Sequence, residues 1–420
     1  MKVCVIGNGG REHALAWRLS ISPSVTKVYA IPGSAAMSDC AELVGIDWQQ
    51  SDHLIRFLKD NHVDLVVVGP EAPLVAGLAD VLNKAGIPVF GPSKAAAQLE
   101  GSKVFAKDLM KKYNIPTAAY GVFHKVDEAK EFIGQTGAPI VVKADGLAAG
   151  KGVVVAMTIE EANAAVEDML SGNRFGEAGS TVVIEEFMYG EEASLLAFVD
   201  GKTVVPMIAS QDHKRIFDGD KGPNTGGMGT YAPAPVLTDA LRDEAMKTIL
   251  APMVAAMEKE GMPYVGCLYA GLMITPQGPK VVEFNARFGD PETQVVLPLL
   301  DSDLGQIMMA CATGTLTADM VKWKDSSAAC VILASKGYPE ISSKGDVIHG
   351  DIKQHDTTIV FHSGTKLVGD EYVTNGGRVL GVVGLGKDLR TALDRAYGRI
   401  EHIDFEGMQY RTDIGAKAFK

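Results

Sequence analysis

The sequence predicts a mixed α/β and α+β protein in three parts: a doubly wound parallel-sheet domain, a longer region of two subdomains, and a small α+β lobe. Three observations lead to this expectation. Short apolar strands first alternate with helical stretches, then shorter strands separated by glycine-rich and charged loops follow, and several strands with one helix come last. We place the parts at residues 1–102, 103–323 and 324–420, with a lid subdomain at about 118–190.

The first part alternates strand and helix, as parallel sheets do. We expect strands at residues 2–6, 25–30 and 65–68, a tight turn at Gly7-Asn8-Gly9-Gly10, and a helix at 11–19. Sheets of this kind bind ligands at the carboxyl ends of their strands. The loops that follow the first and third of these strands are therefore candidate binding segments.

The glycine turn is not a dinucleotide fingerprint, because Glu12 occupies the place of the last glycine in G-x-G-x-x-G. A helix N-terminus after such a turn still binds phosphate, so we expect Gly9, Gly10 and Arg11 to hold a sugar phosphate. A purely structural turn is the alternative. Glu71 follows the third strand, where its carboxylate could accept ribose hydroxyls or be an ordinary helix N-terminal charge.

Two lysines in the second part are candidates for phosphate contacts. Lys103 begins an amphipathic helix, and Lys143 ends an apolar strand, where a buried ammonium group needs an anion. Asp145 is one candidate for that anion, and a nucleotide phosphate is the other.

A small-residue loop follows Lys143 at once. Only three residues separate Gly146 from Gly150, and Gly152 stands at the Ser/Thr position, so this is not a Walker A loop. A glycine loop after a lysine-bearing strand can still close over a triphosphate. We therefore count Gly150, Lys151 and Gly152 among the nucleotide-binding candidates.

An apolar strand beginning at Val182 leads into a connecting segment with several acids. Such a segment can present backbone groups to adenine and a carboxylate to ribose. The candidate for the ribose is Glu192.

The densest cluster of functional groups lies in residues 280–292. Alternate side chains of a strand share a face, so Glu283 and Asn285 point one way while the apolar residues between them point to the core. A carboxylate and an amide oxygen suit a hard divalent cation that holds polyphosphate. A half-buried edge strand is the alternative, but Arg287 follows directly and indicates a second anion nearby.

The stretch from residue 211 to 231 is too polar for a core, so we expect a long loop that is either disordered or folds on a ligand. Its three consecutive cations suit a phosphate or carboxylate, and its glycines allow close approach of backbone amides. Its acids could supply oxygens to a metal. The substrate candidates in it are His213, Lys214, Arg215, Asn224, Thr225, Gly226 and Gly227, and its catalytic candidate is Asp212.

The last part shows no such cluster. Strands are expected at residues 328–333, 358–361, 366–368 and 378–383, and a helix at 389–400. We assign this lobe to packing and to closing the substrate cleft.

Composition limits the partners. A net charge of −12 and a pI near 5.3 argue against a nucleic-acid surface or an anionic membrane. The five cysteines form no C-x-x-C pair and indicate reduced core thiols, and no apolar run is long enough to span a bilayer. We expect a cytoplasmic protein, a monomer with small-molecule substrates.

The order and spacing of Lys103, Lys143 with its glycine loop, Glu185-Glu186-Phe187 with Glu192, and Glu283-Phe284-Asn285 resemble those of the ATP-grasp ligases. Only this resemblance implies that Glu185 and Phe187, the latter through its backbone, are ATP contacts. Within that superfamily the resemblance narrows to the phosphoribosylamine–glycine ligase family of purine biosynthesis. It rests on four long motifs that cover the chain in order: GNGGREHA, QDHKRIFDGD, GPNTGGMGT and NARFGDPET.

This resemblance implies an ATP-dependent ligase that joins glycine to 5-phosphoribosylamine through glycyl phosphate, with Mg²⁺ or Mn²⁺ at Glu283 and Asn285. Arg287, Lys143 and Asp212 are then the catalytic candidates. One departure is Ala270, where many grasp enzymes carry a further metal-binding acid. Two rival interpretations are another grasp ligase acting on a purine precursor, and a regulatory nucleotide-binding module, which would not need Glu283, Arg287 and the 211–231 segment together.

Overall fold

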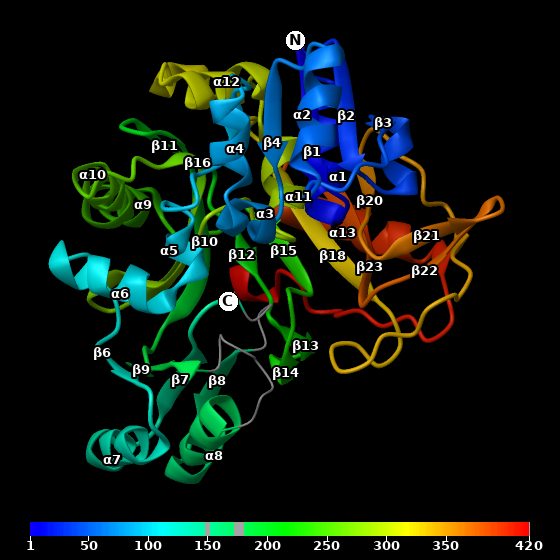
Figure 1. The fold of residues 1–420 in the computed structure, drawn as a ribbon. Coiled ribbons are helices and arrows are strands. Elements are labelled where there is room, and N and C mark those ends of the chain that lie inside the picture. Colours follow the sequence, from blue (N-terminus) through cyan, green and yellow to red (C-terminus); the bar gives the residue numbers. More distant parts are fainter. Residues whose placement is uncertain (148–151, 172–179, 420) are drawn as a thin grey trace.

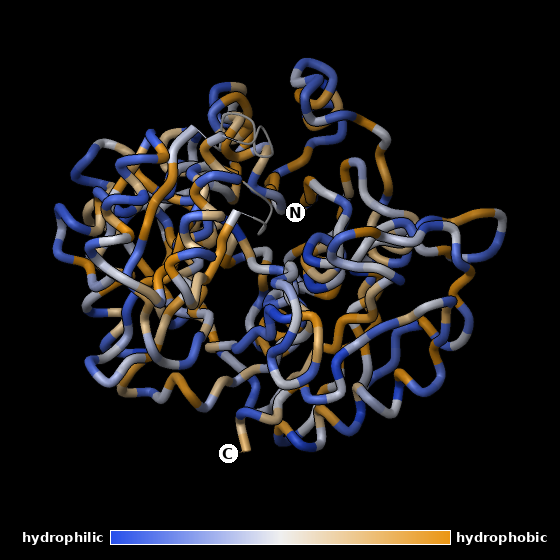
Figure 2. The backbone as a smooth tube through the Cα atoms, turned by 90° about the horizontal axis from the view of Figure 1, so that it is seen from below, coloured by the Kyte–Doolittle hydropathy of each residue, from blue (hydrophilic) through white to orange (hydrophobic). Residues whose placement is uncertain are grey.

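The structure, a computed structural model, describes residues 1–147, 152–171 and 180–419 (Figure 1). Within these ranges four sheets form the framework. Hydrophobic stretches follow the strands through the interior, and hydrophilic stretches lie toward the outside (Figure 2).

The N-terminal domain is a parallel sheet with strand order β3-β2-β1-β4-β5. Alternate residues of β1 enter different cores: Val3 and Val5 pack with α1, whereas Cys4 and Ile6 pack with α2 and α4. Helices therefore cover both faces, which confirms the doubly wound fold. The elements are β1 (Lys2–Gly7), α1 (Gly10–Ser20), β2 (Lys27–Pro32), β3 (Glu42–Leu43), α2 (Ser51–Asp60), β4 (Leu65–Val68), α3 (Glu71–Ala76), α4 (Leu78–Lys84), β5 (Val89–Phe90) and α5 (Gln98–Gly101).

The lid is an antiparallel sheet, β6-β9-β7-β8, with two helices packed on it. Its small apolar core is separate from the others and includes Ile140, Val142 and Ile184. In Figure 1 it projects at the bottom of the molecule. The elements are β6 (Tyr120–Phe123), α7 (Val126–Thr136), β7 (Ile140–Ala144), β8 (Val153–Ala156), α8 (Ile159–Ser171) and β9 (Val182–Glu186).

The second sheet of this region has the order β11-β10-β16-β17. Its two central strands are long and mostly buried, and β17 pairs with one of them, β16, at the edge of the sheet. The elements are α6 (Lys103–Lys112), β10 (Glu191–Asp200), β11 (Val204–Pro206), α9 (Asp239–Ala245), α10 (Ala251–Lys259), β16 (Val265–Thr275), β17 (Gly278–Asn285), α11 (Thr293–Val296) and α12 (Leu304–Thr313).

The last sheet has the order β12-β15-β18-β23-β20, and α13 packs against β18 and β23. Its first two strands come from the stretch expected to be a loop. That expectation was wrong: residues 211–231 are ordered as two sheet strands with a hairpin, β13–β14, between them. The elements are β12 (Gln211–Asp212), β13 (Arg215–Phe217), β14 (Lys221–Asn224), β15 (Gly229–Ala232), β18 (Ser327–Ala334), β19 (His349–Gly350), β20 (Thr358–His362), β21 (Thr365–Val368), β22 (Glu371–Thr374), β23 (Arg378–Gly386), α13 (Leu389–Ile400) and β24 (Ile403–Asp404).

None of the described helices combines the length and the apolar character that a membrane crossing requires.

Candidate active site

Strand β17 has the two faces that its sequence indicates. Glu283, Asn285 and the following Arg287 are half-buried, whereas Phe284 and Ala286 are buried. A bulge in the pairing with β16 lies just before Glu283. The oxygen-bearing face of β17 is therefore open to a ligand while its other face anchors the strand in the core.

Three lysines from separate elements surround Glu283. Burial alone would raise the pKa of this carboxyl, but Lys214, Lys143 and Lys103 outweigh burial and hold the pKa below its ordinary value. Glu283 forms no ion-pair contact within 4 Å among the described residues. It is thus an ionised carboxylate in a cationic setting, which suits a metal ion shared with phosphate groups.

Lys143 forms part of a buried cluster centred on Glu185. Its Nζ lies 3.0 Å from Glu185 Oε2 and 3.0 Å from the carbonyl oxygen of Val282. Lys107 Nζ lies 3.2 Å from the same carboxylate oxygen and donates to Thr117 Oγ1 at 2.8 Å. Burial lowers the pKa of Lys107 to about 8, although Glu185 opposes the shift. One carboxylate therefore serves two buried lysines.

Asp145, the sequence-based candidate for the anion of Lys143, has another role. Its Oδ1 accepts the backbone N–H groups of Lys103 at 2.6 Å and Val104 at 3.2 Å. These bonds cap the start of α6. Lys103 in turn donates from Nζ to the carbonyl oxygen of Gly146 at 2.8 Å, so the start of α6 and the glycine loop are joined.

The remaining nucleotide candidates are only partly described. Gly150 and Lys151 lie outside the described residues, whereas the carbonyl of Gly152 accepts the N–H of Ala144. The rings of Phe187 and Tyr189 lie 4.8 Å apart. The carboxylate of Glu192 lies 2.7 Å from Lys214 Nζ, at the side of the cationic group around Glu283.

The glycine turn of the N-terminal domain is filled by Glu12. Its carboxylate accepts the N–H of Gly9 at 2.8 Å and pairs with Arg11 at 2.6 Å. A β-carbon at Gly7 would lie 2.4 Å from the Glu12 side chain, so only glycine leaves it room. The carboxylate of Glu12 thus satisfies the N–H of Gly9, and the assignment of Gly9, Gly10 and Arg11 to a sugar phosphate stays a prediction.

Arg287 joins β17 to the N-terminal domain. Its guanidinium lies 2.8 Å from Glu100 Oε1 and 3.3 Å from Glu71 Oε2, and it also donates to the carbonyl of Phe288 at 3.2 Å and to Asn285 Oδ1 at 3.4 Å. Glu71 and Arg287, expected to bind substrate separately, are therefore partners of each other. Glu100 was not apparent from the sequence.

The cations of the 211–231 segment differ in character. His213 is buried, and burial lowers its pKa to about 4. Its Nε2 accepts from Gly415 N–H, so Nδ1 carries the proton and donates to Gly229 O at 3.0 Å. His213 is a neutral structural residue, and its assignment as a substrate cation was wrong. Arg215 donates to the carbonyl of Gly222 within its own hairpin.

The glycine-rich loop after the hairpin is held by the C-terminal lobe. Tyr338 Oη accepts the N–H of Gly226 at 3.0 Å, and Arg378 donates to the carbonyl of Gly226 at 2.8 Å. The N–H of Gly227 donates to Thr225 Oγ1 at 3.0 Å. These amides already have partners. The lobe therefore contributes directly to the site, contrary to the expectation that it carries no cluster of polar groups.

A second link from the lobe holds the hairpin itself. The fully buried Arg411 pairs with Asp413 at 2.7 Å and with Asp220 at 2.8 Å. Lys417 lies 2.7 Å from the other oxygen of Asp220, and Asp218 accepts the N–H of Thr412 at 2.9 Å. Asp218 and Asp220 are thus structural anchors and not additional metal ligands.

Asp212 lies beneath this loop, at the end of β12. Burial and the neighbouring Glu292 raise its pKa well above the ordinary value. Glu292 is itself buried and accepts from Tyr269 Oη at 2.6 Å. Sequence reasoning identified Asp212 but missed Glu292.

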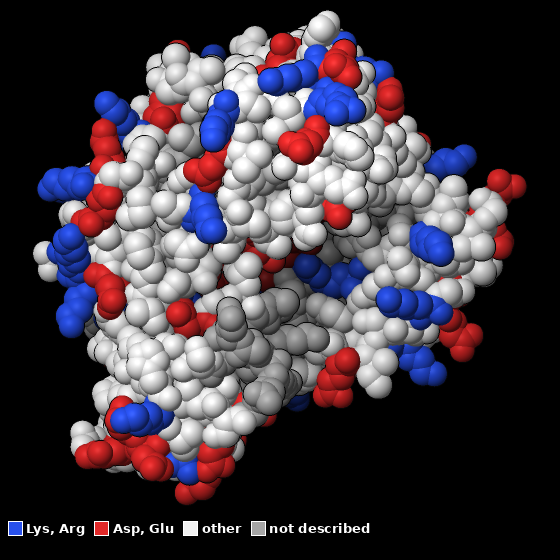
Figure 3. Space-filling view, viewed as in Figure 1, with Lys and Arg blue, Asp and Glu red and all other residues white. Residues whose placement is uncertain are grey.

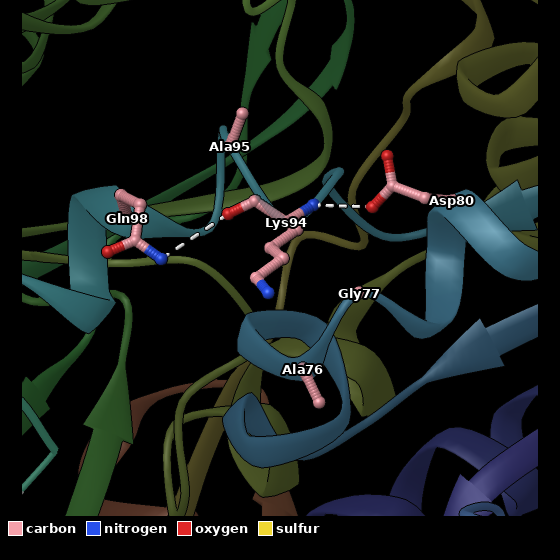
Figure 4. A pocket seen from close by; sticks show the side chains of 6 residues that line it. All are labelled: Ala76, Gly77, Asp80, Lys94, Ala95 and Gln98. Atoms are coloured by element: carbon pink, nitrogen blue, oxygen red, sulfur yellow. Dashed lines mark hydrogen bonds between the residues drawn. The ribbon is translucent and has the colours of Figure 1, made fainter.

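Figure 3 shows a hollow below the N-terminal domain, with acidic and basic atoms inside it. A separate groove on the N-terminal domain involves Asp80, Lys94 and Gln98, whose polar groups bond to one another (Figure 4). The chemistry therefore belongs to the hollow.

Comparison with known families agrees with this arrangement. Residues 1–100, 101–293 and 328–417 match the N domain, the ATP-grasp (A) domain and the C domain of phosphoribosylglycinamide synthetase. The chain belongs to the phosphoribosylglycinamide synthetase family. The phosphoribosylamine–glycine ligase of Halalkalibacterium halodurans is 53% identical over 418 residues, covering 100% of this chain and 97% of the relative.

Solved structures support the family fold. The phosphoribosylamine–glycine ligase of Thermotoga maritima, at 34% identity, superposes with a TM-score of 0.86 over 99% of this chain and 100% of its own. The biotin carboxylase domain of Hydrogenobacter thermophilus 2-oxoglutarate carboxylase, at 16% identity, shares the fold with a TM-score of 0.75 over 97% of this chain and 91% of its own. The prediction of an ATP-grasp ligase of this family is confirmed.

Proposed function

We propose that this chain uses ATP to activate the carboxylate of glycine and then joins the product to phosphoribosylamine. The observation that supports this is the cationic setting of Glu283: Lys214, Lys143 and Lys103 hold its pKa below the ordinary value, and Lys143 Nζ lies 3.0 Å from the carbonyl oxygen of the preceding Val282. Three cations and one anion suit the polyphosphate end of ATP with a divalent ion. Catalysis of this kind rests on positioning and charge neutralisation.

The reaction has two balanced steps. A carboxylate oxygen of glycine attacks the γ-phosphorus of ATP, an O–P bond forms, and ADP leaves. The amine nitrogen of phosphoribosylamine then attacks the acyl carbon, a C–N bond forms, and the C–O bond to phosphate breaks. The amine loses one proton, which leaves glycinamide ribonucleotide, ADP and phosphate.

Glu283 and Asn285 fit a hard cation such as Mg²⁺ or Mn²⁺, because they offer two oxygen donors on one strand face. A cation bound there supplies charge neutralisation on the phosphates. No cluster of three or more His, Cys, Asp or Glu suited to a metal occurs in the described part of the chain, so two protein ligands are the set we propose. The carboxylase domain above, which shares the fold, was solved with the magnesium salt of ADP.

The remaining residues act through position. Lys143 and Lys103 contact the phosphates, Glu185 holds Lys143 in place, and the segment from Phe187 to Glu192 receives the nucleoside. Arg287 keeps β17 against the N-terminal domain. We assign its catalytic contribution to this junction, because each of its nitrogens already has a partner.

Heavy-oxygen labelling tests the acyl phosphate. With glycine labelled in its carboxylate, each turnover moves one labelled oxygen into inorganic phosphate. The amine displaces phosphate at the acyl carbon, so the C–O bond breaks and the former carboxylate oxygen leaves with the phosphate. Unlabelled phosphate accompanied by normal product formation would rule out this route. ADP release measured without glycine or without phosphoribosylamine is the companion control.

The metal assignment has its own test. Glu283→Ala should lose nearly all turnover and its response to added Mg²⁺ or Mn²⁺, with an unchanged melting temperature. Metal-dependent turnover at the normal rate in this variant would contradict the assignment.

A further inference from the structure

Three buried polar atoms near the Gly226–Gly227 loop have no hydrogen-bond partner among the described residues. They are Asp212 Oδ1, Ser210 Oγ and Thr230 Oγ1. Ser210 and Thr230 are 0% exposed. Buried polar atoms are nearly always hydrogen-bonded in native proteins, so three such atoms in one place indicate a bound group.

The three side chains lie on one face of the sheet. Ser210 precedes Asp212 by two residues in an extended segment, and Thr230 stands opposite Asp212 in the β12–β15 register. Gly227 covers Asp212: a β-carbon there would lie 2.8 and 2.9 Å from the two Asp212 carboxylate oxygens. The loop thus closes over Asp212 as tightly as a glycine allows.

A second acid completes the cluster. Glu292 accepts from Tyr269 Oη at 2.6 Å and from Ser194 Oγ at 3.2 Å, and Ser194 bridges to Ser210. In the described part of the chain neither Asp212 nor Glu292 forms an ion pair with a lysine, arginine or histidine. Glu292 is buried and Asp212 is half-buried, and two neighbouring acids of this kind without an ion-paired cation are complementary to a cationic ligand.

We propose that these side chains form an ammonium pocket that holds the charged α-amino group of glycine. An ammonium group has three N–H donors and no acceptor. The pocket presents three polar oxygen atoms without partners and two acids that form no ion pair among the described residues. Its members are Ser194, Ser210, Asp212, Thr230, Tyr269 and Glu292. The inference rests on the proposed function, because it places a substrate of that reaction.

Two amines enter the reaction, and their chemistry distinguishes them. The amine of phosphoribosylamine must present a lone pair to the acyl carbon, whereas the amino group of glycine must not react. A pocket of acids stabilises the protonated, non-nucleophilic form. The pocket therefore suits the amino group of glycine. It also keeps that amino group protonated, so that it does not act as a nucleophile.

The test is steady-state kinetics of Asp212→Asn, with each substrate varied separately. Loss of a buried charge partner should raise the KM for glycine about 100-fold. The KM values for phosphoribosylamine and ATP should change less than about twofold, since neither contacts the pocket. The melting temperature should not fall, because the substitution removes repulsion between Asp212 and Glu292.

Asp303→Asn is the matched control. Asp303 caps α12 through Gln306 N–H and binds Ser24, so an amide keeps the cap and alters the same kind of group far from the pocket. All three KM values should stay at the wild-type level. Thr230→Val is a second pocket variant: loss of one hydroxyl acceptor should raise the glycine KM about fivefold, without loss of stability.

The outcomes separate the possibilities. A rise in the phosphoribosylamine KM with an unchanged glycine KM would assign the pocket to the other amine and overturn the proposal. No change in any KM would mean that the pocket holds only water or a proton, which also overturns it. If the wild-type protein releases ADP at the same rate with and without glycine, the proposed function is overturned as well. This result is distinct from failure of the pocket proposal alone, because it is seen in the protein without any substitution.

Discussion

The role of a single residue can be predicted from the sequence when that role depends on its neighbours along the chain. Glu283 and Asn285 were predictable because strand alternation alone puts them on one face. Glu292 and Lys107 were not, because their partners come from distant segments: Ser194 and Glu185 respectively. His213 was misread for the same reason, since its burial against Gly415 is invisible in a run of cations.

A buried and an exposed lysine can be compared directly by substitution. Lys143→Met removes a buried cation next to Glu283, so kcat/KM should fall about 100- to 1,000-fold. Lys111→Met removes an exposed lysine of α6 whose ammonium lies 6.0 Å from the centre of the Tyr120 ring, and we expect no measurable change. Kinetics with ATP varied measures both. Equal, small effects would mean that Lys143 serves only its ion pair with Glu185.

At the scale of elements, strands with an apolar run of their own were predictable, whereas short strands with polar neighbours were not. The strands at the start of the chain, in the lid and at β18 or β23 stand within a few residues of their expected bounds, because apolar runs mark them. Strands β12 and β15 have two and four residues and polar neighbours, too few to show a period. They are strands because β18 supplies the partner edge. No local signal carries that information.

The β13–β14 hairpin should depend on Arg411. Arg411→Met would leave Asp220 and Asp413 without their common partner, so the hairpin should become sensitive to proteolysis and the glycine KM should rise about tenfold. Arg399→Met is the matched control, since Arg399 of α13 pairs with Asp351, 2.6 Å away, in the same lobe. Its substitution should lower stability without changing the KM. Equal KM effects in the two variants would show a general loss of folding instead of a local role for Arg411.

At the scale of the molecule, the site exists where the parts meet. Arg287 joins β17 to Glu71 and Glu100, and Arg378 of the C-terminal lobe holds Asp290 at 3.0 Å. The number and class of domains followed from patterns along the chain. The contacts between them did not, because each pairs residues remote in sequence, and the expected boundaries at 102 and 323 remain predictions.

The contact between His13 and His362 makes this assembly sensitive to acid. The backbone N–H of His362 donates to His13 Nδ1 at 3.0 Å, which requires that nitrogen to be unprotonated. Burial lowers the pKa of His13 to about 3 and that of His362 to about 4. The unfolded chain thus binds more protons than the folded one below the ordinary histidine pKa near 6.5, so stability should fall as pH drops from about 6.5 toward 4.

Thermal unfolding between pH 7.5 and pH 4.5 measures this effect. His13→Gln keeps an acceptor for the His362 N–H but removes one of the two titrating groups, so its melting temperature should depend less steeply on pH than that of the wild type. His53→Gln, at an exposed histidine of α2, is the control and should reproduce the wild-type slope. Parallel slopes for all three proteins would assign the acid sensitivity to other groups.

The pairing of β15 with β18 also bears on how the chain can be divided. Gly229 lies opposite Val331 and Ala232 opposite Ala328, so this ladder crosses the gap between the regions that match the ATP-grasp and C domains. A fragment ending near residue 300 would expose the edge of β15 and the apolar side of its sheet to solvent. We expect such a fragment to aggregate when produced alone, and to recover solubility when the remaining segment is supplied as a second polypeptide. We therefore expect the segment that folds independently to be larger than either of the two regions matched by homology.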